Sequence, residues 1–213
     1  MDKKRERKNP EKRRQEIIVA ARRLFADQGY DNTTMQQVVK EAGTSIGNCY
    51  FYFSNKMELY QGVVEAVNQE ISALVDTAII QVESPYEKLA AAVYYGVMAV
   101  LELTESAASI LTGTDHPDIR QSIQDHYTKR VYRFLKRNPA VTGDLDLEMT
   151  SVAWQGAMFN LIERYVKEKT GKAPEEVAGF LVKWNLRALN TPEEFIDEVL
   201  SAVGRKYNEQ YGK

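Results

Sequence analysis

The chain has 213 residues, of which 44% are hydrophobic and 27% are charged, and its formal net charge is −2. This composition excludes an intrinsically disordered chain, and the length suffices for one domain or two small ones. The single cysteine excludes an internal disulfide and fits a reducing compartment.

Two further classes of protein are disfavoured by the apolar segments. No apolar segment follows Met1, so we expect no signal peptide. The longest uncharged apolar run, residues 89–101, is shorter than the roughly 18 residues that a membrane span needs. We therefore expect a soluble protein of the cytoplasm.

The N-terminus combines a basic block with a first amphipathic helix. Eight basic and three acidic side chains stand in residues 1–14, so this block is a solvated tail unless its neighbours give it a partner. The helix is predicted over residues 10–28 and ends at Gly29. Its apolar face carries Ile17, Ala20, Ala21, Leu24 and Phe25.

Residues 33–56 predict two short helices joined by a tight turn. Thr33 and Thr34 stand before the first helix at capping-box spacing, and Gly43 stops it, because glycine tolerates the positive φ found there. Ser45 caps the second helix. Apolar side chains repeat at helical spacing in both: Met35, Val38, Val39 and Ala42, then Ile46, Cys49, Tyr50 and Phe53. The pattern is typical of a helix-turn-helix, although an ordinary hairpin within a bundle is its commoner fate.

A longer ordered motif decides between these alternatives. From Thr33 to Leu59 the chain reads T-T-M-x-x-V-V-x-x-A-G-T-S-x-G-x-x-Y-x-Y-F-x-x-K-x-x-L. This run resembles the DNA-binding signature of the tetracycline-repressor (TetR-type) family of bacterial transcriptional regulators. The resemblance covers about the first quarter of the chain. Beyond it, only the length and the all-helical pattern are similar.

The resemblance implies an all-α fold with two parts. Residues 1–55 would form a basic arm and a three-helix DNA-binding unit with a helix-turn-helix. Residues 56–213 would form a larger helical bundle that binds an effector and dimerises, joined to the first part by a long helix. Beside such a unit, the basic block becomes an arm for the phosphate backbone or the minor groove, with Lys12, Arg13 and Arg14 its nearest contacts.

The resemblance also indicates which residues touch DNA. The matching positions are Thr33, Thr34, Ser45, Ile46, Gly47, Asn48, Tyr50, Phe51, Tyr52 and Lys56. Asn48 suits an adenine edge and Phe51 a thymine methyl, whereas Lys56 suits a phosphate. Two positions depart from the family pattern. Cys49 replaces the usual leucine and is interpreted as a small core residue, and Phe51 stands where a polar residue is frequent.

The rest of the chain reads as helices separated by glycine and proline. A long helix is predicted over 56–82, with Asn55 and Glu58 at its start and Ser84-Pro85 after it. Further helical patterns span 86–104, 106–112, 118–137, 145–169, 175–190 and 193–209, and no alternating strand pattern occurs.

Two helices in this part predict a homodimer interface. A protein that reads palindromic DNA needs two copies, and small residues on the helix around 149–165 allow close approach of a partner helix. A central helix in a monomeric bundle is the alternative. The interface candidates are Val152, Ala153, Gly156, Ala157, Asn160, Phe180, Leu181, Trp184 and Ala188.

A small-molecule pocket is predicted where aromatic and polar side chains crowd helices that face inward. Its candidates are Tyr94, Tyr95, His126, Tyr127, Arg130, Trp154, Met158 and Phe159. Each is individually more typical of a core. The segment Asp115-His116-Pro117-Asp118 is interpreted as a loop with Asp118 as a helix cap rather than a metal site.

Together these features favour a ligand-responsive regulator, most plainly a repressor, that binds palindromic operator DNA as a homodimer and is released by a small, largely apolar or aromatic effector. We expect no enzymatic activity, cofactor, metal or membrane partner, because no triad, phosphate loop or spaced ligand set occurs. The alternatives are a constitutive DNA-binding regulator without an effector, a helical enzyme, or an adaptor.

Overall fold

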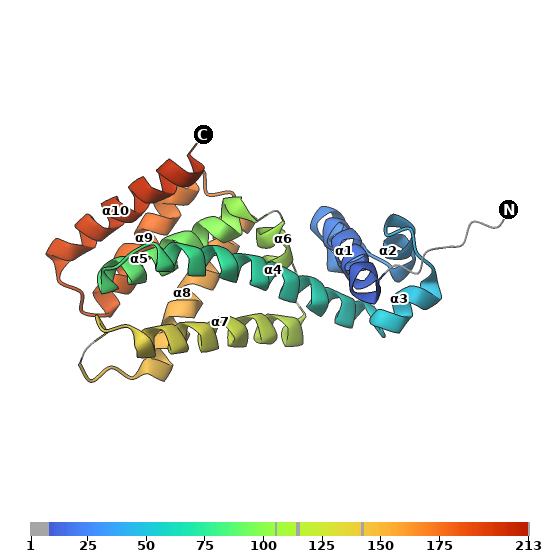
Figure 1. Cartoon of the computed structure of the whole chain (residues 1–213), viewed down its shortest axis with the longest axis horizontal. Coiled ribbons are helices and arrows are strands. Elements are labelled where there is room, and N and C mark those ends of the chain that lie inside the picture. Colours follow the sequence, from blue (N-terminus) through green and yellow to red (C-terminus); the bar gives the residue numbers. More distant parts are fainter. Residues whose placement is uncertain (1–8, 105, 114–115, 142, 213) are drawn as a thin grey trace. The chain divides into compact units, whose positions relative to one another are not determined.

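The computed structural model describes residues 9–104, 106–113, 116–141 and 143–212. All regular elements in these ranges are helices (Figure 1). Contacts divide the chain into two compact units, residues 1–67 and 68–213. The sequence had placed the boundary earlier, at residue 55. No helix in the described ranges is long and apolar enough to cross a membrane.

The first unit contains three helices and the start of a fourth: α1 (Pro10–Asn32), α2 (Met35–Glu41), α3 (Ile46–Tyr52) and α4 (Lys56–Ile80). Asn9 caps α1 by accepting a hydrogen bond from the Glu11 amide at 3.1 Å. At Gly29 the backbone leaves helical geometry, with φ at 81°, which glycine tolerates. The sequence predicts that the helix ends at this glycine, but helical geometry resumes after the kink and continues to Asn32.

An aromatic core holds the first unit together. Tyr60 of α4 meets Phe25 and Tyr30 edge-on, with ring centroids 4.9 and 5.0 Å apart. Phe53 and Cys49 are also buried in this unit. Such edge-to-face packing adds to the burial energy, so short helices that would be unstable alone are fixed by their shared core.

The second unit contains the rest of α4 and the remaining helices: α5 (Pro85–Met98), the π-helical turn η1 (Ala99–Leu103), α6 (Ala107–Thr112), α7 (Pro117–Arg137), α8 (Leu147–Glu168), α9 (Pro174–Ala188) and α10 (Glu193–Tyr211). α5 packs against α9 and α10, and α7 packs against α8 (Figure 1).

The helix predicted over residues 86–104 changes geometry near its end. After Met98 the chain widens into η1, where the Thr104 amide donates to the Ala99 carbonyl, five residues earlier, at 2.9 Å. Single π turns commonly occur at functional sites. Periodicity did not predict this turn, because it preserves the apolar character of the segment.

Candidate nucleic-acid interface and effector cavity

The start of α2 is fixed by reciprocal capping. The Thr34 hydroxyl accepts from the Gln37 amide at 3.2 Å, and Gln37 Oε1 accepts from the Thr34 amide at 2.7 Å. Gly43 has φ at 57° and ends the helix. Ser45 then caps α3 by accepting from the Asn48 amide at 3.2 Å. The turn predicted from the sequence is therefore formed by the residues expected to form it.

The outer face of α3 exposes large side chains. The Phe51 side chain is 78% exposed, and Tyr50 and Ile46 are also exposed. The Tyr52 ring lies edge-on to Phe51, with centroids 5.0 Å apart. A Cβ atom added at Gly47 would meet no other atom within 4 Å, so nothing in the chain covers this point of the helix. An apolar face of this kind calls for a partner.

Asn48 is held in place by its neighbour. Its side-chain nitrogen Nδ2 donates to the Thr44 hydroxyl at 2.8 Å. Its side-chain oxygen Oδ1 accepts no hydrogen bond from the described residues. One donor and one acceptor therefore stay available, which is the pair that an adenine edge requires.

Two expected DNA contacts instead point into the unit. Thr33 is buried, and its hydroxyl donates to the Gly29 carbonyl at 2.8 Å. Lys56 donates to the carbonyls of Tyr30 and Asp31 at 2.8 and 3.3 Å and lies 4.3 Å above the Tyr30 ring. The last carbonyls of a helix lack partners within it, and Lys56 supplies one. Its first role is structural.

The basic arm lies partly outside the described residues, which begin at Asn9. Of its inner side chains, Arg13 pairs with Glu16 at 2.8 Å and the Arg14 guanidinium lies 5.3 Å from the centre of the Phe53 ring. Lys12 is exposed. Among the three basic side chains of the arm that the structure describes, Lys12 alone has no internal contact.

A cavity of about 450 Å³ lies within the second unit. Its walls come from α4, α5, η1, α6, α7 and α8 and are mainly apolar. Five predicted pocket residues line it: Tyr127, Arg130, Trp154, Met158 and Phe159. A volume of this size, closed mostly by apolar side chains with a few polar groups, is typical of a small-molecule site.

Polar contacts join α4 and α7 along this cavity. The Tyr127 hydroxyl of α7 donates to Asn68 Oδ1 of α4 at 2.7 Å. Burial raises the pKa of Tyr127, so the hydroxyl stays protonated. Arg130 of α7 pairs with Asp76 of α4 at 2.7 Å.

The other three predicted pocket residues lie elsewhere, which corrects that part of the prediction. Tyr94 and Tyr95 face α10, where they pack edge-on against Tyr207 with centroids 5.5 and 5.7 Å away. Burial, followed by nearby Glu175, raises the pKa of Tyr94 to about 12. His126 is exposed and lies edge-on to Tyr127, outside the cavity lining.

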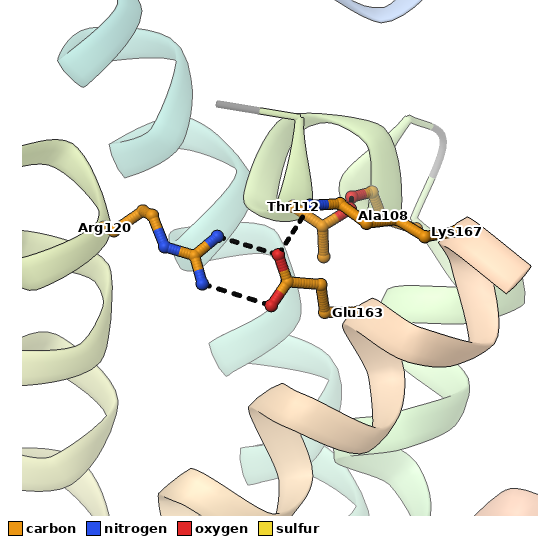
Figure 2. A network of polar contacts seen from close by, with 5 residues as sticks. All are labelled: Ala108, Thr112, Arg120, Glu163 and Lys167. Atoms are coloured by element: carbon orange, nitrogen blue, oxygen red, sulfur yellow. Dashed lines mark hydrogen bonds and ion pairs between the residues drawn. The ribbon is translucent and has the colours of Figure 1, made fainter. Parts of the chain in front are cut away.

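A closed ion-pair network borders the cavity (Figure 2). Arg120 of α7 donates two hydrogen bonds to the Glu163 carboxylate of α8, at 2.7 and 3.1 Å, and Lys167 adds a third at 2.9 Å. The bonds from Arg120 hold the pKa of Glu163 at about 2, well below its ordinary value. The Arg120 guanidinium also lies 5.2 Å from the centre of the Phe159 ring, so this pair supports a cavity wall.

One face of α8 and α9 exposes most of the predicted dimer residues. Val152, Phe180 and Trp184 are the large ones among them. Ala153, Asn160 and Ala188 are exposed, and Gly156 and Ala157 are half-buried. Leu181 corrects the prediction, because it is buried in the core of the single chain. Met149, which was not predicted, extends the exposed face.

The segment before α7 contains no metal site in its described part. Asp115 lies outside the described residues. Among the residues that are described, no group of three His, Cys, Asp or Glu side chains could hold a metal ion. His116, not Asp118, occupies the cap position of α7, and Asp118 lies in the first turn, where a negative charge favours the helix.

Comparison with known families identifies the N-terminal unit. Residues 17–63 match the sequence model of the family described as "Bacterial regulatory proteins, tetR family". Residues 17–63 thus form a tetR-family segment. The match spans most of α1, the whole helix-turn-helix and the start of α4.

A curated relative shares part of the sequence of this chain. The "HTH-type transcriptional regulator HbdR" of Aromatoleum sp. (strain CIB) is 32% identical over 126 residues. These residues make up 56% of this chain and 53% of HbdR, so the chain spans about half of this relative's length.

Solved structures share the fold over a larger fraction of the chain. The structure of RolR in complex with resorcinol has a TM-score of 0.67 at 20% identity, covering 90% of this chain and 94% of RolR. FadR from Bacillus subtilis in complex with stearoyl-CoA also has a TM-score of 0.67, at 19% identity, covering 80% of this chain and 96% of FadR. At such identities the likeness shows the shared fold.

Several residues that line the cavity were not predicted from the sequence. They are Gln155 on α8 and Arg133, Phe134 and Arg137 on α7. For α7, the spacing of Tyr127, Arg130 and Phe134 at three and four residues was the available signal, because it places them on one helix face. Gln155 is polar and directly follows Trp154, and nothing in the sequence pattern indicated that its side chain is buried.

Proposed function

We propose that the chain is a transcriptional regulator that binds duplex operator DNA as a homodimer and is controlled by a small, largely apolar or aromatic effector. The exposed face of α3 is the observation that carries the DNA-binding part. Helix-turn-helix proteins place the second helix in the major groove, and here that helix presents Phe51, Tyr50 and a half-satisfied Asn48. Release by the effector would make it a repressor.

The exposed positions of α3 support the following assignment of individual DNA contacts. Asn48 reads an adenine edge, Phe51 packs on a thymine methyl, and Tyr50 and Tyr52 reach phosphates. Ser45, Thr34, Ile46 and Gly47 border the groove, and the basic arm adds sequence-independent affinity. Thr33 and Lys56 act by holding α1 against the start of α2 and α4.

The homodimer is supported by the exposed apolar face of α8 and α9. Two-fold symmetric proteins match two half-sites of a palindrome, and a single half-site supplies few contacts. Phe180, Trp184 and Val152 expose enough apolar surface to call for a partner. A second copy of the same face is the partner that operator symmetry requires.

The cavity supports control by an effector over a constitutive regulator with a filled core. RolR and FadR, which share the fold, were solved with resorcinol and stearoyl-CoA bound, so this fold accepts ligands of very different size. α4 contributes Ile71, Val75 and Ile79 to the cavity wall and begins at Lys56 in the first unit. A ligand that displaces α4 therefore acts on an element shared by both units, and by reciprocity DNA weakens ligand binding by the same factor.

The decisive experiment measures DNA binding by a double variant. In a gel-shift titration with DNA fragments taken from around the gene itself, Asn48→Ala together with Tyr52→Ala should weaken binding by at least the roughly 1–3 kcal/mol of one lost base contact. Gln61→Ala, at an exposed position of α4, is the matched control. Unchanged affinity of the double variant would reject the assignment of α3. Lys56→Ala is a poorer test, because it also removes bonds that hold α1.

A further inference from the structure

Two arginines of α7 pair with carboxylates near the cavity, and the two pairs differ in how fully they are closed. Arg120 bonds both oxygens of Glu163, whose side chain is only 14% exposed and takes a third bond from Lys167 (Figure 2). Bidentate geometry with little solvent makes this pair hard to replace. Arg120 is therefore committed to the protein itself.

Arg130 has fewer of its hydrogen-bond donors occupied by the protein. One of its nitrogens, Nη2, contacts Asp76 Oδ1 at 2.7 Å and, at 3.4 Å, the Ser72 carbonyl. No contact of its Nε or Nη1 is seen in the described ranges. The Asp76 side chain is 57% exposed, whereas that of Arg130 is 29% exposed and lines the cavity. Asp76 can return to water at little cost, but Arg130 stays beside the cavity and needs another anion.

The charges around the cavity also favour an anionic ligand. Its charged lining residues are Asp76, Arg130, Arg133 and Arg137, so arginine outnumbers acid. Arg133 and Arg137 are exposed and lie on the same helix as Arg130. A ligand with a negative group at this edge gains from all three, whereas a cation is repelled.

The α8 wall of the cavity contains a side-chain amide that has no hydrogen-bond partner among the described residues. Gln155 of α8 lines the cavity and is only 7% exposed. Its side chain makes no hydrogen bond within the part of the chain that the structure describes. Its amide nitrogen and oxygen are not among the fully buried polar atoms that lack a partner, so they are accessible and can bond a polar group of a ligand.

We propose that the effector is an amphipathic carboxylic acid, whose carboxylate displaces Asp76 from Arg130 and whose apolar body fills the cavity beside Trp154. This inference rests on the proposed function, because it names the chemical class of the effector. Arginine forms paired bonds with a planar carboxylate, and the unused Nε and Nη nitrogens present that geometry. Gln155 binds a second polar group on the body where one is present.

The exchange has a direct structural result. Asp76 belongs to α4 and Arg130 to α7, so replacement of Asp76 by the ligand removes one of the polar contacts between these helices. The Tyr127–Asn68 bond and the longer contact from Arg130 to the Ser72 carbonyl remain. Ligand binding thereby loosens the C-terminal half of α4 from α7, at the place where the effector signal must enter α4.

The test uses matched acids and amides with the full-length protein. Octanoate, decanoate and 4-phenylbutyrate, each beside its neutral amide, are titrated by calorimetry at neutral pH. At least one acid should bind about tenfold more tightly than its amide, as a charge-assisted pair requires. Arg130→Gln should abolish this preference without changing the affinity for the amide. Lys129→Gln removes the same charge from an exposed neighbouring position and should leave the preference intact.

Asp76→Asn gives a readout that a merely structural role would not give. If Asp76 competes with the ligand, its removal should raise the affinity for the acid several-fold and leave that for the amide unchanged. If Asp76 only positions Arg130, the affinity for the acid should fall. A fall, equal binding of every acid and amide, or no binding by any acid overturns the proposal.

The failure of this inference and that of the proposed function can be told apart by gel shift in parallel. DNA binding that is released by neutral compounds and not by acids rejects the carboxylate and keeps the regulator. Acids that bind at Arg130 in a protein without DNA affinity keep the ligand class and reject the regulator.

Discussion

The outer face of α3 and the shared face of α8 and α9 both expose large apolar side chains, but they are built differently. α3 has seven residues, and local features fix its place: the Ser45 cap, the Gly43 turn and the buried Cys49. On α8 and α9 the exposed residues alternate with core residues, so that buried Leu181 directly follows exposed Phe180. A surface for DNA can thus be specified within one short motif, whereas a surface for a second copy depends on how a whole bundle packs.

Blocking the α8–α9 face should have the largest effect on the protein. Gly156→Arg should give a folded monomer that no longer binds operator DNA tightly. A Cβ atom at Gly156 meets nothing within 4 Å in the chain itself, so the arginine is tolerated by the fold and obstructs only a partner. Analytical ultracentrifugation measures the outcome. Ser122→Arg, at an exposed position of α7, should stay dimeric; a dimeric Gly156→Arg protein would place the interface elsewhere.

Leu181 and Trp184 separate the core from the surface on a single helix. Leu181→Ala should lower the free energy of unfolding by roughly 2–5 kcal/mol, because it leaves a cavity where a fully buried side chain packed. Trp184→Ala should affect dimerisation far more than the stability of the monomer. Urea unfolding in the Gly156→Arg background, where no dimer contributes, compares the two. Equal losses would mean that α9 has no free face.

Acid should weaken the second unit through Glu163. Because its pKa in the folded chain is lowered to about 2 from an ordinary 4.5, the stabilisation is complete above about pH 5 and is lost as the pH falls toward 2. We expect a loss on the order of 2 kcal/mol after screening by solvent. Urea unfolding at several pH values, followed by tryptophan fluorescence, measures it. Glu163→Gln should flatten this dependence, whereas Glu168→Gln, in an exposed pair with Arg164, should not.

The smallest effect concerns the first unit alone. Thr34→Ala removes the reciprocal cap of α2 and should cost about 1 kcal/mol, whereas Thr34→Ser keeps the hydroxyl and should cost less. Thermal unfolding by circular dichroism detects the difference. If alanine and serine behave alike, the cap contributes nothing and the core alone positions the hairpin.

The two regions also differ in how much the sequence predicted. Caps and turns act over three or four residues, so Thr34, Gly43 and Ser45 could be assigned from their spacing. For the second unit, periodicity showed which face of α5 is apolar but not which helix covers it. Tyr94 and Tyr95 were therefore assigned to the cavity, whereas they pack against α10.

Burial of polar groups was the other limit. Lys56 carries a charge and reads as a surface residue, yet the free carbonyls at the end of α1 draw it inward. Gln155 has no apolar signature, although its helix turns it into the cavity. Both outcomes depend on partners distant in the sequence, which no local pattern records.

The buried thiol of Cys49 can be used as a probe for local opening of the first unit. It is the only cysteine in the chain, it faces the core from α3, and burial raises its pKa, so reagents cannot reach a reactive thiolate in the closed state. The rate at which a thiol reagent labels the native chain therefore measures how often α3 separates from the core of the first unit. Both tryptophans, Trp154 and Trp184, lie in the second unit. Thiol labelling thus reports opening of the first unit, and tryptophan fluorescence reports unfolding of the second unit, in the unmodified protein.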